Sequence, residues 1–181
     1  MYLYGNKVLL RALEIEDMEF LRTTANDPNI ENMVGGWSFP ISKESQMNWF
    51  NSLQPSERNI RYAIELLENK QFVGMISLLS VDWKNRTGMS AIKLVSDAPH
   101  GRGIATEAEK LLLDYCFYEL NLNRITAEVI EYNEPSIALH KKVGYVLEGK
   151  KREAVFKKGK FHTVLSFAML KSDYLNYSNN R

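Results

Sequence analysis

The stretch SDAPHGRGIATEAEKLLLDYC, residues 96–116, places two glycines and an arginine directly before a run with helical spacing. Within it, Thr106 and Glu109 have the T-x-x-E spacing of a capping box, which predicts that the helix begins at Thr106. The first amides of a helix have no partner inside the helix, and together they carry about half a positive charge. The loop before this helix therefore lies at a position that attracts anions.

The composition of that loop suits a phosphate group. Gly101 and Gly103 carry no side chains that would keep a phosphate oxygen from the main chain, and Arg102 adds a charged donor at the edge. Two alternatives stay open at this point. The glycines also suit a plain tight turn between a strand and a helix. The run GRGIAT partly resembles the dinucleotide fingerprint G-x-G-x-x-G, although it lacks the third glycine and follows hairpin strands rather than parallel ones.

The composition predicts one domain. With 181 residues, 45% of them hydrophobic, the chain can bury one sizeable core, so we expect a single domain over 1–181, with a core of about 7–170 and a C-terminal tail at 171–181. The formal net charge of +1 gives no overall field for a polyanion. The charge is uneven, however, because residues 1–70 are net acidic and residues 141–160 are net basic.

Several classes of protein are disfavoured. Cys116 is the lone cysteine and the three histidines are scattered, so neither a disulfide framework nor a metal site is expected. No apolar run approaches the roughly 18 residues that cross a bilayer, and the N-terminus lacks the pattern of a secretory leader. We therefore expect a cytoplasmic protein with no membrane partner.

The hydrophobic pattern predicts an α/β chain. A strand at 7–13 precedes a helix at 14–26, an aromatic loop follows at 29–40, and Ser42 is the predicted N-cap of a second helix. The chain then changes to short strands. A helix joins the strand at 89–95 to the strand at 124–131, and this arrangement implies a parallel crossover. The predicted later elements are strands 61–68, 71–81 and 89–95, the helix after residue 105, strand 124–131, helix 135–144, and strands 145–150 and 163–170.

Two longer stretches carry a family resemblance. The run HGRGIATEAEKLLLDYCF at 100–117 and the run LNLNRITAEVIEYNEPSIALHKKVGYVLEG at 120–149 together resemble the coenzyme A core of the GNAT superfamily of N-acetyltransferases. They look most like the branch that holds ribosomal-protein N-terminal and spermidine N-acetyltransferases, over about residues 7–170. The resemblance implies an α/β (α+β) GNAT fold: a mixed, mostly antiparallel sheet of about seven strands, with a splayed pair around a β-α-β crossover and about four flanking helices.

The resemblance implies acetyl-CoA as the co-substrate and no metal. The glycine loop would wrap the pyrophosphate, although His100 stands where family members usually have Gln or Arg. The main chain of Leu94 and Val95 would meet the pantetheine and the acetyl carbonyl. Asn133 would hold the coenzyme or fix the following turn, and a helix cap explains it equally well. In full, the implied coenzyme-binding residues are Leu94, Val95, His100, Gly101, Arg102, Gly103, Ile104, Ala105, Thr106, Asn133 and Ser136.

Acetyl transfer to an amine also needs an acid and a base. His140 stands where spermidine-type relatives have a tyrosine near the sulfur, so it is the candidate for protonating the departing thiolate; a structural histidine, with water as the acid, is the alternative. Family members often have a glutamate on the strand before the loop, but Ser90 occupies that position here. Glu128 is the substitute base that we name, and Glu131 and Asp82 stay as alternatives.

The resemblance places Glu31, Trp37 and Phe39 in the segments that wall the acceptor pocket of relatives. These residues suit a cationic amine, such as a polyamine, an amino sugar or an amino acid. Two other functions stay open: acetylation of a peptide or protein N-terminus, with the basic stretch at 150–160 aiding docking, and a non-catalytic module that binds coenzyme A or nucleic acid. A nucleic-acid partner is not expected, because a solvated hairpin explains the basic stretch better. The resemblance also allows a homodimer.

Overall fold

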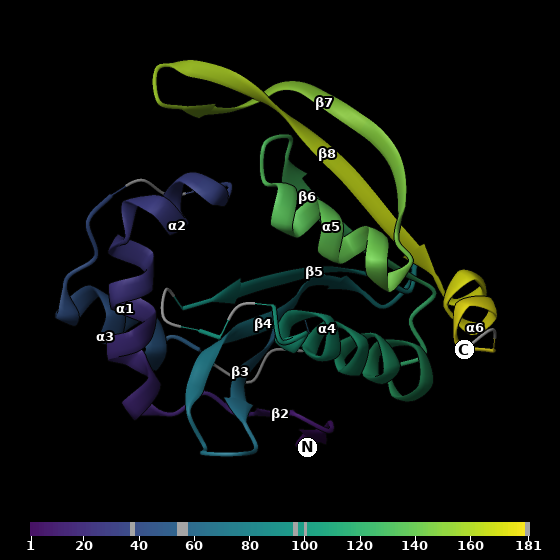
Figure 1. Ribbon diagram of the computed structural model, residues 1–181, viewed down its shortest axis with the longest axis horizontal. Coiled ribbons are helices and arrows are strands. Elements are labelled where there is room, and N and C mark those ends of the chain that lie inside the picture. Colours follow the sequence, from purple (N-terminus) through teal and green to yellow (C-terminus); the bar gives the residue numbers. More distant parts are fainter. Residues whose placement is uncertain (37–38, 54–57, 96–97, 100, 180–181) are drawn as a thin grey trace.

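The protein folds around one mixed sheet. The computed structural model describes residues 1–36, 39–53, 58–95, 98–99 and 101–179. Eight strands form the sheet in the order β1-β2-β3-β4-β5-β6-β8-β7 (Figure 1). One more strand is present than expected because β1 (Leu3–Tyr4) has only two residues, too few to leave a periodic pattern in the sequence.

The first part of the sheet is antiparallel. It contains β2 (Val8–Arg11), β3 (Ile60–Leu66), β4 (Phe72–Asp82) and β5 (Thr87–Leu94), which pair in chain order. Short turns join β3 to β4 and β4 to β5, and a connection of that length returns the chain as an antiparallel neighbour. The predicted hairpins are therefore confirmed.

A helical crossover joins β5 to β6 (Arg124–Ile130) through α4 (Ile104–Asp114) and a π-helical turn (Tyr115–Glu119). The two strands pair in parallel, as predicted, but only over Thr87–Met89 and Arg124–Thr126. Beyond these residues β5 and β6 separate (Figure 1). We call the unpaired edges that face each other there the strand gap; they are residues 90–94 of β5 and 127–130 of β6.

The second part of the sheet continues from β6. α5 (Glu134–Val143) has Pro135 in its first turn and ends at Gly144, whose φ of 105° explains the glycine. β7 (Val146–Lys157) and β8 (Lys160–Leu170) then form an antiparallel hairpin, with β8 between β6 and β7. In Figure 1 this hairpin runs along the top of the molecule, and Lys157 at the end of β7 pairs with Glu31 of α2.

Three helices lie between β2 and β3: α1 (Met18–Asn26), α2 (Pro28–Met33) and α3 (Lys43–Asn51). Ser42 caps α3, as predicted, by accepting a hydrogen bond from Ser45 N at 3.0 Å. Part of the expected loop at 29–40 is instead α2, which Asp27 caps by accepting from the N–H of Asn29. A helix of six residues is too short to show a periodic apolar face, so the pattern did not reveal it.

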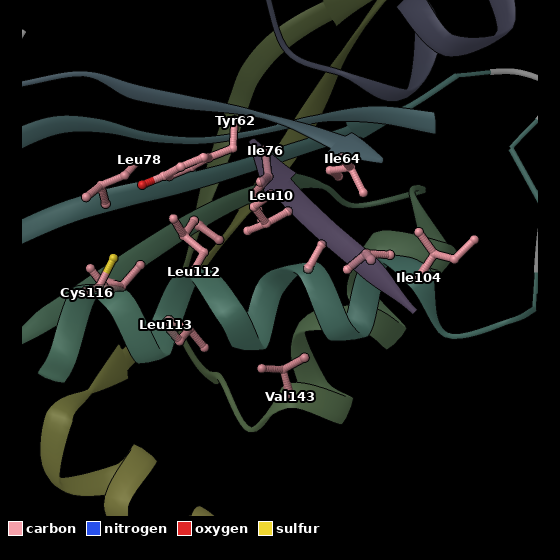
Figure 2. Packing of buried hydrophobic residues seen from close by; sticks show 14 of the residues in the cluster. Leu10, Tyr62, Ile64, Ile76, Leu78, Ile104, Leu112, Leu113, Cys116 and Val143 are labelled. Atoms are coloured by element: carbon pink, nitrogen blue, oxygen red, sulfur yellow. The ribbon is translucent and has the colours of Figure 1, made fainter. Parts of the chain in front are cut away.

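Helix α4 packs across the antiparallel part of the sheet and fixes the position of its own N-terminus. Figure 2 shows strand side chains facing the buried side of α4. Burial of each large apolar side chain contributes about 1.5–3 kcal/mol. The fully or almost fully buried residues at this contact are Leu10, Tyr62, Ile64, Ile76, Leu78, Ile104, Leu112 and Cys116, whereas Leu113 points from the other side of α4 toward Val143.

The C-terminal segment differs from the expected tail. Residues Lys171–Asn179 form α6, which brings the described helices to six rather than four. Tyr174 anchors this helix: its ring lies 5.2 Å from that of Phe117, and its hydroxyl donates to Asp114 Oδ1 at 2.9 Å. A mostly polar helix anchored through an aromatic side chain has no apolar periodicity that sequence reasoning can detect.

Candidate active site

The glycine loop opens directly onto α4. The helix begins at Ile104, and Gly103 is its N-cap with a φ of 78°, while Gly101 has a φ of 74°. Both values lie in the left-handed region, where a residue with a Cβ is strained. A Cβ added to Gly101 would meet nothing within 4 Å. These glycines thus serve the backbone conformation and leave the surface of the loop open.

The main-chain donors of this loop have no acceptor within the part of the chain that the structure describes. Among the hydrogen bonds between described residues outside helices and strands, none uses an N–H of residues 101–106 as donor. The N–H groups of the first helical turn have no intrahelical acceptor either. Among the described residues, these donors at the positive end of a helix have no acceptor, which fits a phosphate. His100 lies outside the described residues.

The predicted capping box is wrong. The helix begins two residues before Thr106, and Glu109 is completely buried. The Glu109 carboxylate accepts hydrogen bonds from Ser90 Oγ at 2.9 Å and from the Tyr145 hydroxyl at 2.7 Å. The T-x-x-E spacing does not say which face of the helix carries the glutamate, and here that face lies against the sheet and the segment after α5.

Two cations flank the loop. Arg102 forms a bidentate pair with Glu68, at 2.8 and 2.9 Å, and both side chains are about half exposed. Lys7 Nζ donates to the Arg102 carbonyl at 2.9 Å and lies 3.8 Å from where a Cβ of Gly103 would be. The main chain of Lys7 is held in turn by the carboxylate of Glu107. Sequence reasoning missed Lys7, because it is 95 residues away from the loop in the chain.

The main chain of β5 alternates between its two neighbours. The Arg86 carbonyl accepts from Arg124 N at 3.2 Å, so even-numbered residues of β5 direct their peptide groups toward β6. Val95 N donates to Val73 O at 3.0 Å, on the opposite side. The peptide groups of Leu94 consequently face the strand gap, as expected for a contact with the pantetheine. The N–H of Val95 instead donates to Val73 O within the sheet.

Asn133 makes two hydrogen bonds within the fold. Its Oδ1 accepts from Ser136 N at 3.2 Å, which caps α5, and its Nδ2 donates to Met33 O at 2.8 Å, which ties α5 to α2. The helix-cap alternative for Asn133 therefore has direct structural support. Ser136 follows in the first turn of α5, with its Oγ 3.4 Å from His140 Nδ1.

His140 is packed inside the protein, with 4% of its surface exposed. Its Nδ1 lies 2.7 Å from Ser136 O, one helical turn earlier. The imidazole stacks on Phe167 at a ring distance of 5.7 Å and meets Tyr145 edge-on at 5.1 Å. These contacts match those of a structural histidine, the alternative that the sequence left open.

The three candidate bases occupy different places. Glu128 lies on β6 at the strand gap and forms an ion pair with Lys151. Glu131 follows β6 and accepts from Thr163 N at 3.0 Å, which lowers its carboxyl pKa. Asp82 lies at the turn between β4 and β5, the end of β5 away from the gap, and binds the Asn85 main chain. Position along the strands thus favours Glu128 over Asp82.

Helix α2 lies at the end of the strand gap and is tied to the far side of it. The Tyr132 hydroxyl, just after β6, donates to Asn32 O at 2.6 Å. Lys157, at the end of β7, donates to Glu31 O at 3.1 Å and also pairs with the Glu31 carboxylate. The expected acceptor residue Glu31 is thus near the gap but already ion-paired.

The two aromatic residues expected at the acceptor pocket are less informative. Phe39 has 65% of its surface exposed, in the segment between α2 and α3. Trp37 lies outside the described residues. The structure therefore brings Glu31, Glu128 and Leu94 toward the strand gap, and the phosphate-binding loop lies at the start of the helix that follows β5.

Comparison with known proteins agrees with this geometry. A family model described as "Acetyltransferase (GNAT) domain" matches residues 7–146. The chain belongs to the GNAT family. An uncharacterised N-acetyltransferase, p20, of Bacillus licheniformis is 32% identical, with 95% of this chain and 97% of that protein covered. A Bacillus subtilis protein provisionally named ribosomal N-acetyltransferase is 30% identical, with 92% and 93% covered. The crystal structure of spermidine N-acetyltransferase from Vibrio cholerae, in complex with CoA and spermine, has a TM-score of 0.85 and 27% identity, and 95% of this chain and 100% of that one are covered.

Family membership establishes the class of reaction. This GNAT chain is an acyltransferase that uses acetyl-CoA, and the alternative of a non-catalytic module is set aside. Within the described residues, no group of three or more His, Cys, Asp or Glu side chains is arranged to hold a metal ion. A search of the same residues finds no helix long and apolar enough to span a membrane.

Proposed function

We propose that this GNAT enzyme transfers the acetyl group of acetyl-CoA to the primary amine of a small molecule, by direct attack of the amine within a ternary complex. The observation that carries this proposal is that no described residue accepts a hydrogen bond from the main-chain N–H groups of residues 101–106, which lie next to the strand gap. A diphosphate bound by these donors directs the thioester arm along β5. The main chain of Leu94 then lies beside the arm as a neighbouring strand would.

Residues around the loop add charge to this site. Lys7 Nζ is close enough to the Gly103 backbone to reach a phosphate bound there. The guanidinium of Arg102 is half exposed and already pairs with Glu68. It therefore contributes less binding energy to the phosphate than Lys7 does. We assign the phosphate contacts to the main chain of residues 101–106 first, to Lys7 second, and to Arg102 last.

The function is tested by measuring coenzyme A binding and turnover separately. Calorimetric titration measures the affinity for coenzyme A, which depends on the glycine loop. Detection of the thiol released when acetyl-CoA reacts with amines measures acetyl transfer. The amines include polyamines, amino sugars, amino acids and short peptides. A folded protein that does not bind coenzyme A would disprove the proposed site.

Glu128 is the base that we propose for removing a proton from the attacking amine. Glu128→Gln is expected to lower kcat by about 10- to 100-fold, because general base catalysis contributes at least this much, and to leave the affinity for coenzyme A unchanged. Steady-state kinetics and calorimetry check the two halves of this expectation. Glu131→Gln is the matched control, with kcat near that of the wild type; the reverse pattern would assign the base to Glu131.

His140 is, in our proposal, a packing residue, with water protonating the thiolate. His140→Phe keeps a flat ring between Phe167 and Tyr145 and loses the hydrogen bond to Ser136 O, which is worth about 0.5–1.5 kcal/mol of stability. We expect kcat and its pH profile to stay near those of the wild type. A fall in kcat with unchanged affinity for coenzyme A would instead assign the acid role to His140.

A peptide N-terminus is the second candidate acceptor, and the β7–β8 hairpin is the observation that favours it. Phe156 and Phe161 are about 60% exposed, with ring centroids 5.0 Å apart, near the exposed lysines 158 and 160. An aromatic pair on a basic arm suits contact with a larger substrate. Faster turnover of short peptides than of any free amine would support this candidate.

A further inference from the structure

The sheet face that meets the acceptor can be assigned from side-chain alternation. Ser90 of β5 binds Glu109 of α4, so the side chain of Lys93, three residues later, points to the opposite face. On β6, Ala127 is paired with Phe167, which stacks on His140 of α5, so Glu128 also points away from the helices. Lys93 and Glu128 therefore lie on the same face, away from α4 and α5, on the two sides of the strand gap.

Carboxylates on this face form ion pairs with lysines of the β7–β8 hairpin. Glu128 pairs with Lys151, and Glu31 pairs with Lys157, whose side chain is only 5% exposed. Lys93 is a further charge on this face. Within the described part of the chain, no hydrogen bond or ion pair engages its ammonium group, and the residue is partly buried.

The environment of Lys93 is one that an anion would improve. Burial is the largest cause that lowers the pKa of the Lys93 ammonium; the charge of Glu31 opposes this shift, and that of Lys157 adds to it. A lysine held in such a place has lost water without gaining a carboxylate partner. A bound anion would restore a partner and favour the charged form.

We infer that the acceptor of this enzyme carries an anionic group, a carboxylate or a phosphate, beside its primary amine, and that Lys93 binds that group. The inference rests on the proposed function. Lys93 is adjacent in the chain to Leu94, which faces the strand gap, and successive strand residues are about 3.3 Å apart. An anion held by Lys93 thus stays close to the thioester, and the amine next to it lies within reach of Glu128.

The same charges disfavour a polyamine. A polyamine presents cations along its whole length, and its recognition needs carboxylates that are free to pair with them. Here Glu31 is paired with a buried lysine of the hairpin, Glu128 is shared with the half-exposed Lys151, and Lys93 has the same sign of charge as the polyamine. Similarity in fold to a spermidine acetyltransferase thus does not by itself assign the acceptor of this chain.

Matched pairs of acceptors test the inference. Thiol release is measured with an amino acid and its amide, with glucosamine 6-phosphate and glucosamine, and with spermidine. We expect at least one anionic member to exceed its uncharged partner by about 10-fold or more in kcat/KM, as a charge-assisted hydrogen bond allows. The two pairs distinguish a carboxylate from a phosphate as the anion.

Variants at Lys93 link that preference to the residue. Lys93→Met keeps the length of the side chain and should remove the preference, while Lys93→Arg should retain it. Lys84→Met is the control, because Lys84 is exposed in the turn at the other end of β5. The inference fails if spermidine is the best acceptor, if no anionic amine is turned over, or if Lys93→Met keeps the preference. A protein that is folded but does not bind coenzyme A contradicts the proposed function itself.

Discussion

Gly103→Val is expected to weaken coenzyme A binding about a thousandfold and to leave the protein folded. Gly103 is the N-cap of α4 with a φ of 78°, so a β-branched residue there would force the peptide to rotate. Rotation misaligns the N–H groups that grip the phosphates, and the added methyl groups occupy the path of approach. Loss of two main-chain bonds to a charged phosphate, each worth about 1.5–3 kcal/mol, corresponds to roughly a thousandfold in Kd.

Gly159→Val is the matched control for that variant. Gly159 lies in the turn between β7 and β8 with a φ of 82°, and nothing lies within 4 Å of an added Cβ. The backbone strain is therefore comparable, about 1–2 kcal/mol, but the site is far from the glycine loop in the chain. We expect both variants to lose similar stability and only Gly103→Val to lose coenzyme A affinity. Calorimetric binding by Gly103→Val within tenfold of the wild type would contradict the loop as the diphosphate site.

The features that the sequence predicted well are local ones. A positive φ requires glycine because of the backbone at that residue alone. Gly101 and Gly103 therefore predicted a loop before a helix without information from the rest of the chain. The hairpins β3–β4 and β4–β5 follow from short connections, which allow only an antiparallel return. The parallel crossover through α4 follows from the same reasoning, and all of these were confirmed.

The features that sequence reasoning missed depend on contacts across the fold. Lys157 and Glu31 are 126 residues apart, and only the hairpin β7–β8 brings the lysine to α2. This pair changes the interpretation of Glu31 from a free carboxylate that attracts cations to a neutralised one. Lys7 lies at the glycine loop for the same kind of reason, because it directly precedes β2, which pairs within the sheet. Charges along a sequence therefore predict the sign of a site poorly until their partners are known.

Glu109→Leu is expected to lower the free energy of unfolding by about 3–5 kcal/mol. Glu109 is completely buried, and its carboxylate is the acceptor for both Ser90 Oγ and the Tyr145 hydroxyl. Burial and the neighbouring carboxylate raise the pKa of Tyr145 well above its usual value, so its hydroxyl remains a donor over the working pH range. Removal of the acceptor leaves two buried hydroxyl groups unpaired, each at a cost of about 1–3 kcal/mol, and the shape change adds to this. Denaturant unfolding measures the loss.

Two further variants separate the loss of the Glu109 hydrogen bonds from the effect of any glutamate-to-leucine change near α4. Glu119→Leu changes an exposed glutamate in the turn that follows α4 and is expected to alter stability by less than about 0.5 kcal/mol. Tyr145→Phe removes one donor and leaves Ser90 bound, so its cost should be about half that of Glu109→Leu. Because Ser90 lies on β5 at the start of the strand gap, loosening of this network also shifts the strand along which the thioester lies. Glu109→Leu should therefore raise the KM for acetyl-CoA even at temperatures where the variant is folded. Equal stability of Glu109→Leu and the wild type would contradict the prediction, because the buried hydroxyl groups would then have found other acceptors.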